Sequence, residues 1–414
     1  MNPPAGTPLL TAYCTAANLA APLLLRSVAR GLARAGVPGE RIAERDGRAS
    51  LPRPEGRLVW LHGASVGEGL SLLPLASELR RRGSGVMLTT GTAAAAEILP
   101  ARLPEGALHQ FAPLDAAGPL RRFLGHWRPD AVAFAESEIW PQTILRLSAR
   151  GVPLALVNAR LSARSAARWQ GRATSAARLF SAFGLVAAQG PQNAARLTAL
   201  GAAAVFDGGD AKAAAPPPPA DEGELAALRA ALGERPVWAA ISTHPGEEEL
   251  VLRAHEAVRA ERPDALLLLV PRHVERAGPV AALAGGPPRR SAGERPAGPV
   301  YLADSFGETG LWMRLAGAVF LGGSLVPVGG HNPWEPARLS RPLLHGRHVE
   351  SAAPAYAALT RAGAAREVTA ESLGAAVLAA LRGDGPDGAA GAEVAEVEAE
   401  RFRAALDRVA GFLA

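Results

Sequence analysis

Three carboxylates stand where apolar stretches of the sequence give way to polar ones. Glu68 lies in LHGASVGEG (61–69), and Glu136 and Glu138 lie in FAESEIWP (134–141). A carboxylate at the turn between a strand and a helix can act as a general base if its pKa suits the reaction. If the second strand continued, Glu136 and Glu138 would point to opposite sides, and one of them would face a ligand. A Glu at a helix start is also favoured by the helix dipole alone, so Glu68 has a structural interpretation too.

The same stretch contains a second candidate nucleophile. Gly63 to Gly67 matches the pattern G-x-S-x-G with Ser65 at its centre, the nucleophile elbow of α/β-hydrolases. That elbow normally follows several strands, whereas this one would follow the first. An esterase that uses Ser65 is therefore the weaker enzymatic alternative.

A glycine-rich segment, GGSLVPVGGHNPWEPA (322–337), follows the apolar run 316–321. Glycine weakens regular structure, so the cluster suggests that a ligand approaches the main chain closely. A helix that starts near Pro333 would turn free N–H groups toward an anion. Glu335 could then accept hydrogen bonds from ribose hydroxyls, and the segment is interpreted as a nucleotide-binding loop.

Further polar clusters follow other apolar runs of the second half of the chain. They are STHPGEEE, VPRHVER and DSFGETG, which contribute His244, Arg272 and the backbone near Gly307. Arginine suits a phosphate group because its planar guanidinium can donate two hydrogen bonds at once. These clusters, together with Asn332, predict a site for a phosphate-containing donor.

Lys212 is the only lysine in the chain; every other basic residue except histidine is arginine. It lies at a stretch that ends in four prolines, DGGDAKAAAPPPPA (207–220), which reads as a stiff spacer between domains. A compact ammonium group and a planar guanidinium are not interchangeable at a tight site. Lys212 is therefore either a spared linker residue or a required one, and we favour the second interpretation.

The composition excludes several classes of protein. The formal net charge is only +5, and no basic cluster interleaved with aromatic residues is present, so nucleic acid is not an expected partner. A single cysteine rules out an internal disulfide and a cysteine-based metal site. There is no Asp-x-Asp pair and no histidine-rich metal spacing, so we expect neither a metal nor a cofactor.

The N-terminal residues 1–25 carry no charged side chain, and Arg26, Arg30 and Arg34 follow at a spacing of four. Positive charge on the C-terminal flank places the rest of the chain in the cytoplasm. The segment is interpreted as a membrane anchor, either a short span or an interfacial helix. A buried N-terminal helix is the alternative.

Four further arginines recur every four residues within NARLSARSAARWQGR (158–172), which predicts one basic helix face. Such a face is either simply solvated or contacts anionic lipid head groups.

Short apolar runs alternate with helical stretches from residue 57 onward, which is typical of parallel sheets with crossover helices. The expected strands are 57–62, 85–90, 131–136, 153–158, 184–189, 236–243, 265–271, 299–304, 316–323 and 341–346. The sequence therefore predicts an α/β protein with two Rossmann-like domains, whose ligands bind beyond the carboxyl ends of the strands, in the cleft that the domains face. The expected divisions are an anchor at 1–34, an N-terminal domain at 35–208, a hinge at 209–220, a C-terminal domain at 221–392 and a helix at 393–414 that packs back.

Taken in order, these motifs resemble one family. HGASVGE, ESEIWP, NARLS, STHPGEEE, VPRH, FGE and GGSLVPVGGHNPWEP are similar to the motifs of 3-deoxy-D-manno-octulosonic acid (Kdo) transferases over about residues 57–350. The resemblance implies a GT-B fold with an N-terminal anchor, at the cytoplasmic side of the inner membrane. It also implies transfer of Kdo from CMP-Kdo to a lipid A precursor, lipid IVA, with inversion and without a metal.

The resemblance implies roles for particular residues. Glu68 would be the general base, and Glu138 and Lys212 would stabilise the transition state. The residues implied to bind CMP are Pro271, Arg272, Phe306, Gly307, Glu308, Asn332, Pro333, Trp334 and Glu335, with His244, Gly330 and His331 as further donor-site candidates. The chain departs from the family at the neighbours of Lys212. It also departs at Pro333 and Trp334, two positions where the family tends to have aliphatic residues.

A non-enzymatic alternative is an inactive GT-B scaffold that only binds lipid. The presence of Glu68, Glu138, Arg272 and Lys212 together argues against it.

Overall fold

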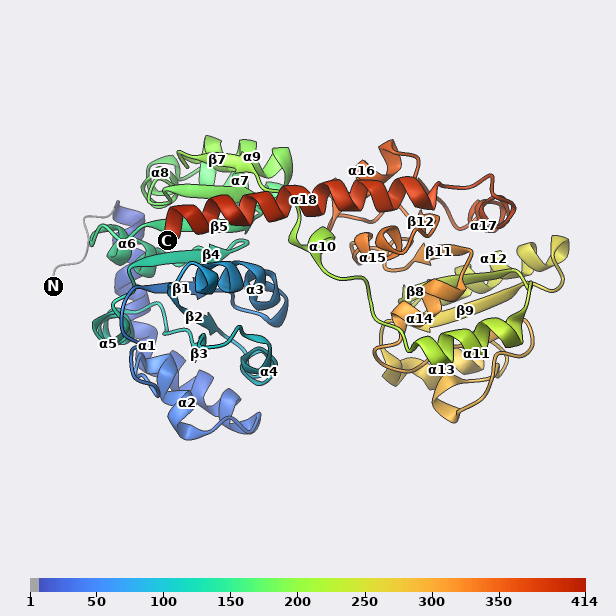
Figure 1. The fold of residues 1–414 in the computed structure, drawn as a ribbon, viewed down its shortest axis with the longest axis horizontal. Helices are drawn as coiled ribbons and strands as arrows, with labels where there is room; N and C mark the ends of the chain where they lie inside the picture. Colours follow the sequence, from blue (N-terminus) through green and yellow to red (C-terminus); the bar gives the residue numbers. More distant parts are fainter. Residues whose placement is uncertain (1–6) are drawn as a thin grey trace. The chain divides into compact units, whose positions relative to one another are not determined.

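The computed structural model describes residues 7–414, and the chain divides into two compact units. Unit 1 comprises Met1–Ala211 and Glu400–Ala414, and unit 2 comprises Lys212–Ala399. Each unit is built around one parallel sheet with helices between consecutive strands (Figure 1).

The sheet of unit 1 has seven strands in the order β3-β2-β1-β4-β5-β6-β7, and every pair is parallel. The strands are β1 (Leu58–His62), β2 (Gly85–Thr90), β3 (Leu108–Phe111), β4 (Ala131–Ala135), β5 (Leu154–Ala159), β6 (Leu185–Ala188) and β7 (Val205–Asp207). The helices are α1 (Pro8–Arg34), α2 (Gly39–Ala43), η1 (Glu44–Asp46), α3 (Val66–Arg81), α4 (Ala93–Ile98), η2 (Pro100–Arg102), α5 (Ala117–Trp127), α6 (Pro141–Ser148), α7 (Ala163–Gln170), α8 (Ala173–Phe180) and α9 (Gly190–Ala199).

The sheet of unit 2 has six strands in the order β10-β9-β8-β11-β12-β13, again all parallel. The strands are β8 (Val237–Thr243), β9 (Leu266–Pro271), β10 (Val300–Leu302), β11 (Ala318–Leu321), β12 (Leu343–His345) and β13 (Ala365–Glu367). The helices are α10 (Ala211–Ala214), α11 (Glu222–Leu232), α12 (Glu248–Glu261), η3 (Val274–Arg276), α13 (Ala277–Leu283), η4 (Arg290–Ala292), α14 (Thr309–Leu315), α15 (Trp334–Arg338), α16 (Ala353–Arg361), α17 (Leu373–Arg382) and α18 (Gly388–Leu413).

Both sheets are buried on both faces, which explains why their strands read as continuous apolar runs. Along β8, Val237, Ala239 and Ile241 belong to one hydrophobic cluster, whereas Trp238 and Ala240 belong to another. Alternate side chains therefore pack under helices on opposite faces of the sheet. All ten expected strands are confirmed.

Three strands were missed by the sequence analysis, namely β3, β7 and β13. Each is three or four residues long and lies at an edge of its sheet, with the sequences LHQF, VFD and ARE. β7 and β13 are only partly buried, and β3 buries the polar residues His109 and Gln110, so none of the three strands is apolar throughout.

The first helix, α1, lies against unit 1 along one side and exposes an apolar side. The Tyr13 hydroxyl donates a hydrogen bond to Asp115 at 2.9 Å, and the Asn18 side chain accepts one from the Ala117 amide at 2.7 Å. Leu19 and Leu23 are 78% and 68% exposed. Within residues 7–414, α1 is the one helix long and apolar enough to cross a membrane by length and composition, which by itself is weak evidence.

The last helix, α18, begins five residues before the expected Glu393 and ends at Leu413, and its residues from Glu400 belong to unit 1. Phe402, Leu406 and Val409 are buried, whereas Val397 is 54% exposed.

The expected basic helix face at 158–172 is also wrong in part. Arg160 precedes α7 and forms an ion pair with Glu136 at 3.0 Å, and Arg172 lies beyond Gly171, which ends α7, at the start of α8. Only Arg164 and Arg168 share the exposed face of one helix.

Candidate functional site

The carboxyl ends of β1 and β4 form the centre of the candidate site in unit 1. The strand order reverses between these two neighbours, with β2 and β3 on one side and β5 to β7 on the other. Open α/β sheets bind ligands at such a switch point, outside the carboxyl ends of the strands. His62 ends β1 opposite Phe134 of β4, so the side chains that follow both strands meet here.

Glu138 is held in place at this point by two ring nitrogens. It accepts hydrogen bonds from Trp140 Nε1 at 2.6 Å and from His62 Nε2 at 3.2 Å, while His62 Nδ1 contacts Thr89 Oγ1 at 2.9 Å. Burial raises the pKa of the Glu138 carboxyl, but the hydrogen bond and charge of His62 and the Trp140 bond outweigh it, so the pKa lies below its ordinary value. The carboxylate is thus kept ionised in a largely enclosed position.

The backbone at this turn differs from the expectation. β4 ends at Ala135, and Glu136 adopts a left-handed conformation with φ of 48°, so the strand does not continue through Glu136 and Glu138. The turn, rather than strand alternation, separates the two carboxylates, and Glu136 pairs with Arg160.

Glu68 and Ser65 form a capping box at the start of α3. The Ser65 hydroxyl accepts a hydrogen bond from the Glu68 amide at 3.3 Å, and Glu68 Oε2 accepts one from the Ser65 amide at 3.1 Å. The helix-start interpretation of Glu68 therefore holds locally, and the reciprocal bonds also fix the direction of the carboxylate. Ser65 has an extended backbone and caps a helix, whereas a nucleophile elbow is a strained turn.

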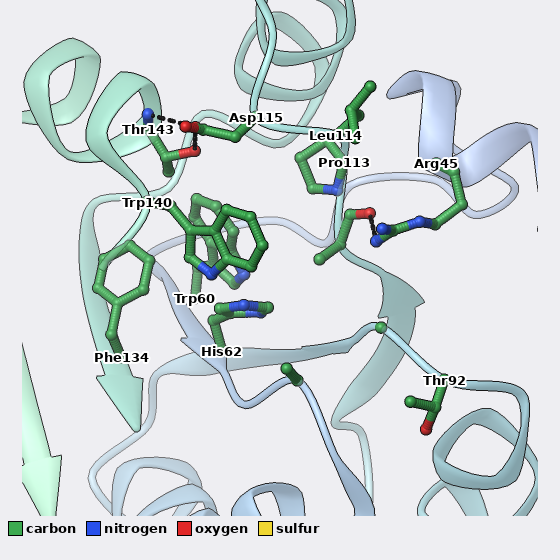
Figure 2. Close-up of a pocket in the computed structure, with 13 residues that line it drawn as sticks. Arg45, Trp60, His62, Thr92, Pro113, Leu114, Asp115, Phe134, Trp140 and Thr143 are labelled. Carbon is green, nitrogen blue, oxygen red and sulfur yellow. Dashed lines mark hydrogen bonds between the residues drawn. The ribbon is translucent and has the colours of Figure 1, made fainter. Parts of the chain in front are cut away.

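A partly open cavity of about 240 Å³ lies at the same edge of the sheet (Figure 2). Figure 2 shows the rings of Trp60, His62 and Trp140 gathered on one side of it, with Pro113 and Leu114 on another. Its walls come from the loops that follow β1, β2, β3 and β4 and from the region of η1. Ala64, one residue before Ser65, is part of the wall, so the cavity adjoins the turn that carries Glu68.

The glycine-rich segment of unit 2 is organised around a buried carboxylate. Glu247 is fully buried and accepts hydrogen bonds from the amides of His244, Gly323, Ser324 and Leu325 at 2.7–3.2 Å. The amide of Gly330 donates to the carbonyl of Gly323 at 2.8 Å and closes the loop.

The reason for the glycines is therefore different from the expected one. A Cβ on Gly322 would lie 2.5 Å from the Ser242 carbonyl oxygen, and Gly323, Gly329 and Gly330 have positive φ angles. The glycines allow close packing within the unit and a tight loop. They need no ligand at the main chain to explain them.

The closed loop brings two histidines together. His244 Nε2 and His331 Nε2 are 2.9 Å apart, and the two rings are stacked at 11° with centroids 5.1 Å apart. Burial, with the charges of His244 and Arg272 adding to it, lowers the pKa of His331 to about 4, and burial also lowers the pKa of His244. Both rings are neutral near pH 7, and one donates to the other.

A second cavity, of about 230 Å³, joins several of the expected donor residues in unit 2. Lys212, Asn332, Trp334 and Glu335 all line it. Asn332 Nδ2 donates to Glu335 Oε1 at 3.2 Å, and the Trp334 amide donates to Asn332 Oδ1 at 3.3 Å. Burial raises the pKa of Glu335, while Asn332, Lys212 and Arg272 act in the opposite direction. The structure thus places the lysine and the Asn-x-x-Glu motif at one cavity.

The remaining donor candidates lie around this region or outside it. Arg272 directly follows Pro271, the last residue of β9, and its exposed side chain has no ion pair among residues 7–414. Phe306 is 89% exposed, and Gly307 has φ of 84°. Glu308 binds Arg290 at 2.6 Å, and this hydrogen bond lowers the pKa of its carboxyl. Glu308 therefore holds a loop together and does not line the second cavity. The next residue, Thr309, does line it.

Pro333 and α15 are placed as expected, but the helix is short. Pro333 is the N-cap and α15 spans five residues, Trp334–Arg338. Arg338 lines the cavity and donates from Nη1 to the carbonyl of Ala213 at 2.7 Å, which ties α15 to the segment of Lys212.

Several residues of these sites were not singled out from the sequence. His62, Trp140 and Glu247 each lie inside a motif that the sequence analysis quoted, within three positions of a residue that it did name. For His62 and Trp140 the sequence did offer a signal, namely an aromatic or imidazole side chain beside a strand-end carboxylate. The run of three glutamates at 247–249 gave no sign that two of them, Glu247 and Glu248, are buried.

The chain is similar to known proteins over most of its length. Residues 40–215 match the family model described as 3-Deoxy-D-manno-octulosonic-acid transferase (kdotransferase). The 3-deoxy-D-manno-octulosonic acid transferase of Haemophilus influenzae is 36% identical over 358 residues, covering 83% of each chain. The protein of the same name from Bordetella pertussis is 36% identical over 373 residues, covering 85% of this chain and 86% of the relative. The chain belongs to the Kdo transferase family.

As a member of that family the protein is a glycosyltransferase that transfers Kdo in lipopolysaccharide biosynthesis. Its two Rossmann-like units have the GT-B fold. A solved glycosyltransferase from Rickettsia africae, 10% identical, covers 87% of this chain with a TM-score of 0.56, and 98% of that chain is covered. The function of this chain is therefore Kdo transfer. The two alternatives, an esterase that uses Ser65 and an inactive scaffold, are wrong.

Proposed function

We propose that the enzyme transfers Kdo from CMP-Kdo to the lipid A precursor lipid IVA, with inversion and without a metal. The observation that carries this proposal is the placement of Lys212, Asn332 and Glu335 at one cavity of unit 2, in a member of the Kdo transferase family. An amide, a carboxylate and an ammonium group at one cavity can bind ribose hydroxyls and a phosphate. The cavity is smaller than a pocket for a whole nucleotide sugar, about 300–1,000 Å³, so it would take one part of the donor.

In the proposed reaction Glu68 acts as the general base. Its Oε2 is oriented by the Ser65 amide, and its carboxylate takes the proton of the acceptor hydroxyl as that oxygen bonds to the anomeric carbon. The bond from the anomeric carbon to the phosphate breaks on the opposite face, and CMP leaves with the electron pair. Attack opposite to the leaving group inverts the configuration.

The charge that develops in this reaction needs stabilisation from fixed groups. The charges of Lys212 and of the exposed Arg272 both act to lower the pKa of Glu335, and both cations would face the departing phosphate or the carboxylate of the sugar. Glu138, kept ionised by His62 and Trp140, would stabilise positive charge on the sugar ring. Pro271, Phe306, Gly307, Trp334, His244 and His331 are proposed to shape the donor site, with Gly330 closing its loop.

The enzyme is proposed to act at the cytoplasmic side of the inner membrane. Helix α1 exposes leucines along one side while hydrogen bonds to Asp115 and Ala117 join it to unit 1, which favours a helix lying in the interface over a free span. Arg26, Arg30 and Arg34 are exposed and would contact anionic head groups.

The test is a transfer assay with labelled CMP-Kdo and acylated disaccharide acceptor, followed by determination of the anomeric configuration of the product. We expect transfer in the presence of a metal chelator and an inverted product. Retention of configuration, or loss of activity with the chelator that added metal restores, would contradict the mechanism.

A further inference from the structure

The aromatic cavity of unit 1 offers an unusually apolar surface for a cavity at a switch point. Most polar groups that line it already have partners within the protein. Asp115 accepts hydrogen bonds from Tyr13, from the amides of Gln142 and Thr143, and from the Thr143 hydroxyl, at 2.6–3.0 Å. Its carboxylate is thereby saturated and unavailable to a ligand.

The ring nitrogens around the cavity are likewise engaged. Trp60 Nε1 donates to Thr89 Oγ1 at 2.7 Å, Trp140 Nε1 donates to Glu138, and both nitrogens of His62 have partners. What these side chains present to the cavity is therefore their ring carbon surface. Pro113, Leu114 and Phe134 extend that surface (Figure 2).

One buried donor in the wall remains without a partner. Arg45 donates from Nη1 to the carbonyl of Ala112, but its Nε is buried and makes no hydrogen bond within residues 7–414. A sugar ring carries several hydroxyls, and each would be left unsatisfied in such a cavity at a substantial cost. The enclosed Nε is out of reach of a ligand, so the cavity suits a hydrocarbon chain, which needs an apolar surface and no hydrogen-bond partner.

The cavity is also joined to the apolar N-terminal helix. Asp115, in its wall, accepts a hydrogen bond from the hydroxyl of Tyr13 in the N-terminal part of α1, whose other side exposes Leu19 and Leu23. A lipid chain that leaves an interface at α1 would thus meet the cavity within the same unit. At about 240 Å³ the cavity holds a segment of such a chain, since pockets for whole drug-sized ligands start at about 300 Å³.

We propose that this cavity binds an acyl chain of the glycolipid acceptor, with the methylenes against Trp60, Trp140 and Leu114. This inference rests on the proposed function for the identity of the acceptor. It assigns a role in acceptor selection to residues outside the proposed catalytic set. Binding of the chain would place the acceptor beside the turn that carries Glu68, since Ala64 belongs to the same wall.

The experiment uses the full-length protein and a series of water-soluble N-acylglucosamines that differ only in chain length. Each methylene buried in the cavity should tighten binding by roughly three- to fourfold. Ala112→Phe and Leu114→Trp, which fill the cavity, should remove this dependence on chain length. Ala94→Phe is the matched control, because Ala94 is exposed on α4, close in sequence to Thr92 of the wall, but does not line the cavity.

The outcomes separate the alternatives. Equal dependence on chain length in the parent and in both filling variants, with melting temperatures unchanged, would overturn the proposal. An equal loss of binding for acylated and non-acylated glucosamine in the filling variants would show that the cavity holds the sugar ring and would also overturn it. If a filling variant fails to fold, the parent series and the other filling variant still decide the result.

Two further experiments identify which lipid supplies the acyl chain and separate this proposal from the proposed function. Monomeric short-chain phosphatidylglycerol is tested in the same way; if it shows the dependence and the acylated glucosamine does not, the occupant is a membrane lipid and the acceptor assignment is wrong. Kdo transfer by the parent is measured separately. Transfer without dependence on chain length refutes only the cavity assignment, whereas dependence on chain length without transfer to a lipid A precursor refutes only the proposed acceptor.

Discussion

At the scale of single residues, the carboxylates of unit 1 are distinguished by what holds them. Glu68 is oriented by a helix cap, whereas Glu138 is held by His62 and Trp140 in a mostly buried position. The first geometry leaves a carboxylate able to take a proton at a turn, and the second keeps a carboxylate ionised in place. Substitutions can test the two roles separately.

Replacing Glu68 by Gln should lower kcat by roughly 10²–10⁴-fold, because Gln keeps the size of the side chain but cannot take a proton. Affinity for CMP, measured by calorimetry, should stay the same. The control is Ser65→Ala, which removes the cap acceptor and should cost about 1 kcal/mol of stability while retaining the carboxylate and most of the activity. A parallel loss of CMP binding in Glu68→Gln would make Glu68 a binding residue.

Replacing Lys212 by Arg should lose nearly as much activity as replacing it by Ala. The residue lies at the start of unit 2 and lines the cavity of Asn332 and Glu335, where a planar guanidinium occupies more room than an ammonium group. A charge that acts mainly in the transition state should change kcat more than KM. Because Lys212 is exposed, the melting temperature should move by only a few degrees. A parental kcat in Lys212→Ala would show that the lysine is a spared linker residue.

The pKa of Glu138 also makes the stability depend on pH. Since the pKa in the folded protein is below the unfolded value of 4.5, ionised Glu138 stabilises the fold above pH 4.5, and this contribution is lost as the pH falls from there through the lower folded pKa. Glu138→Gln cannot titrate, so the advantage of the parent in melting temperature should shrink across that window. Calorimetric scans at several pH values would measure it, and a constant or growing advantage would contradict the lowered pKa.

At the scale of elements, α1 is the clearest case of one helix with two different sides. Leu10 and Cys14 are buried against unit 1, whereas Leu19 and Leu23 are exposed. A soluble core helix would bury both sets. The exposed leucines therefore need another apolar phase, and the bonds of Tyr13 and Asn18 show that the helix stays joined to the domain while it contacts that phase.

Substituting Leu19 and Leu23 together by Glu should release the protein from vesicles that contain anionic lipid, without unfolding it. The two side chains make few contacts within the unit, so the melting temperature should be unchanged. Val397→Glu, at an exposed valine on α18, is the matched control and should still sediment. If the double variant sediments like the parent at high salt, membrane binding lies elsewhere in the chain.

At the scale of the whole molecule, the chain folds into two units with their own cores. The six strands of unit 2 follow the same order about a switch point as the first six strands of unit 1. Two such units need not unfold in a single step, so a single unfolding free energy need not describe the protein. A ligand of one unit should then stabilise that unit selectively.

CMP should accordingly raise the unfolding temperature of unit 2 and leave that of unit 1 unchanged. At a CMP concentration 100 times Kd the added stability is about 2.7 kcal/mol. Scanning calorimetry of the parent and of Asn332→Ala would test this, with the shift much reduced in the variant, since Asn332 orients Glu335 and caps the Trp334 amide. An equal shift in the variant would place the nucleotide away from this cavity.

The sequence by itself determined the interior strands and the family motifs. Buried parallel strands are apolar on both faces, so β1, β8 and β11 can be recognised from local composition alone. The Kdo transferase motifs were visible for a related reason, since strand ends and their turns are short and contiguous in the chain. The short edge strands β3, β7 and β13 escaped because their composition is not apolar enough to mark them.

Only the tertiary structure decided which partners these residues have. Glu138 meets His62 across 76 positions of sequence, Glu247 binds amides near position 324, and His244 pairs with His331. The glycines of 322–330 were explained by the Ser242 carbonyl and by their positive φ angles, and Ser65 by a cap. Such contacts arise because parallel strands bring distant segments to one edge of a sheet, and no local pattern of residue types records which segments meet there.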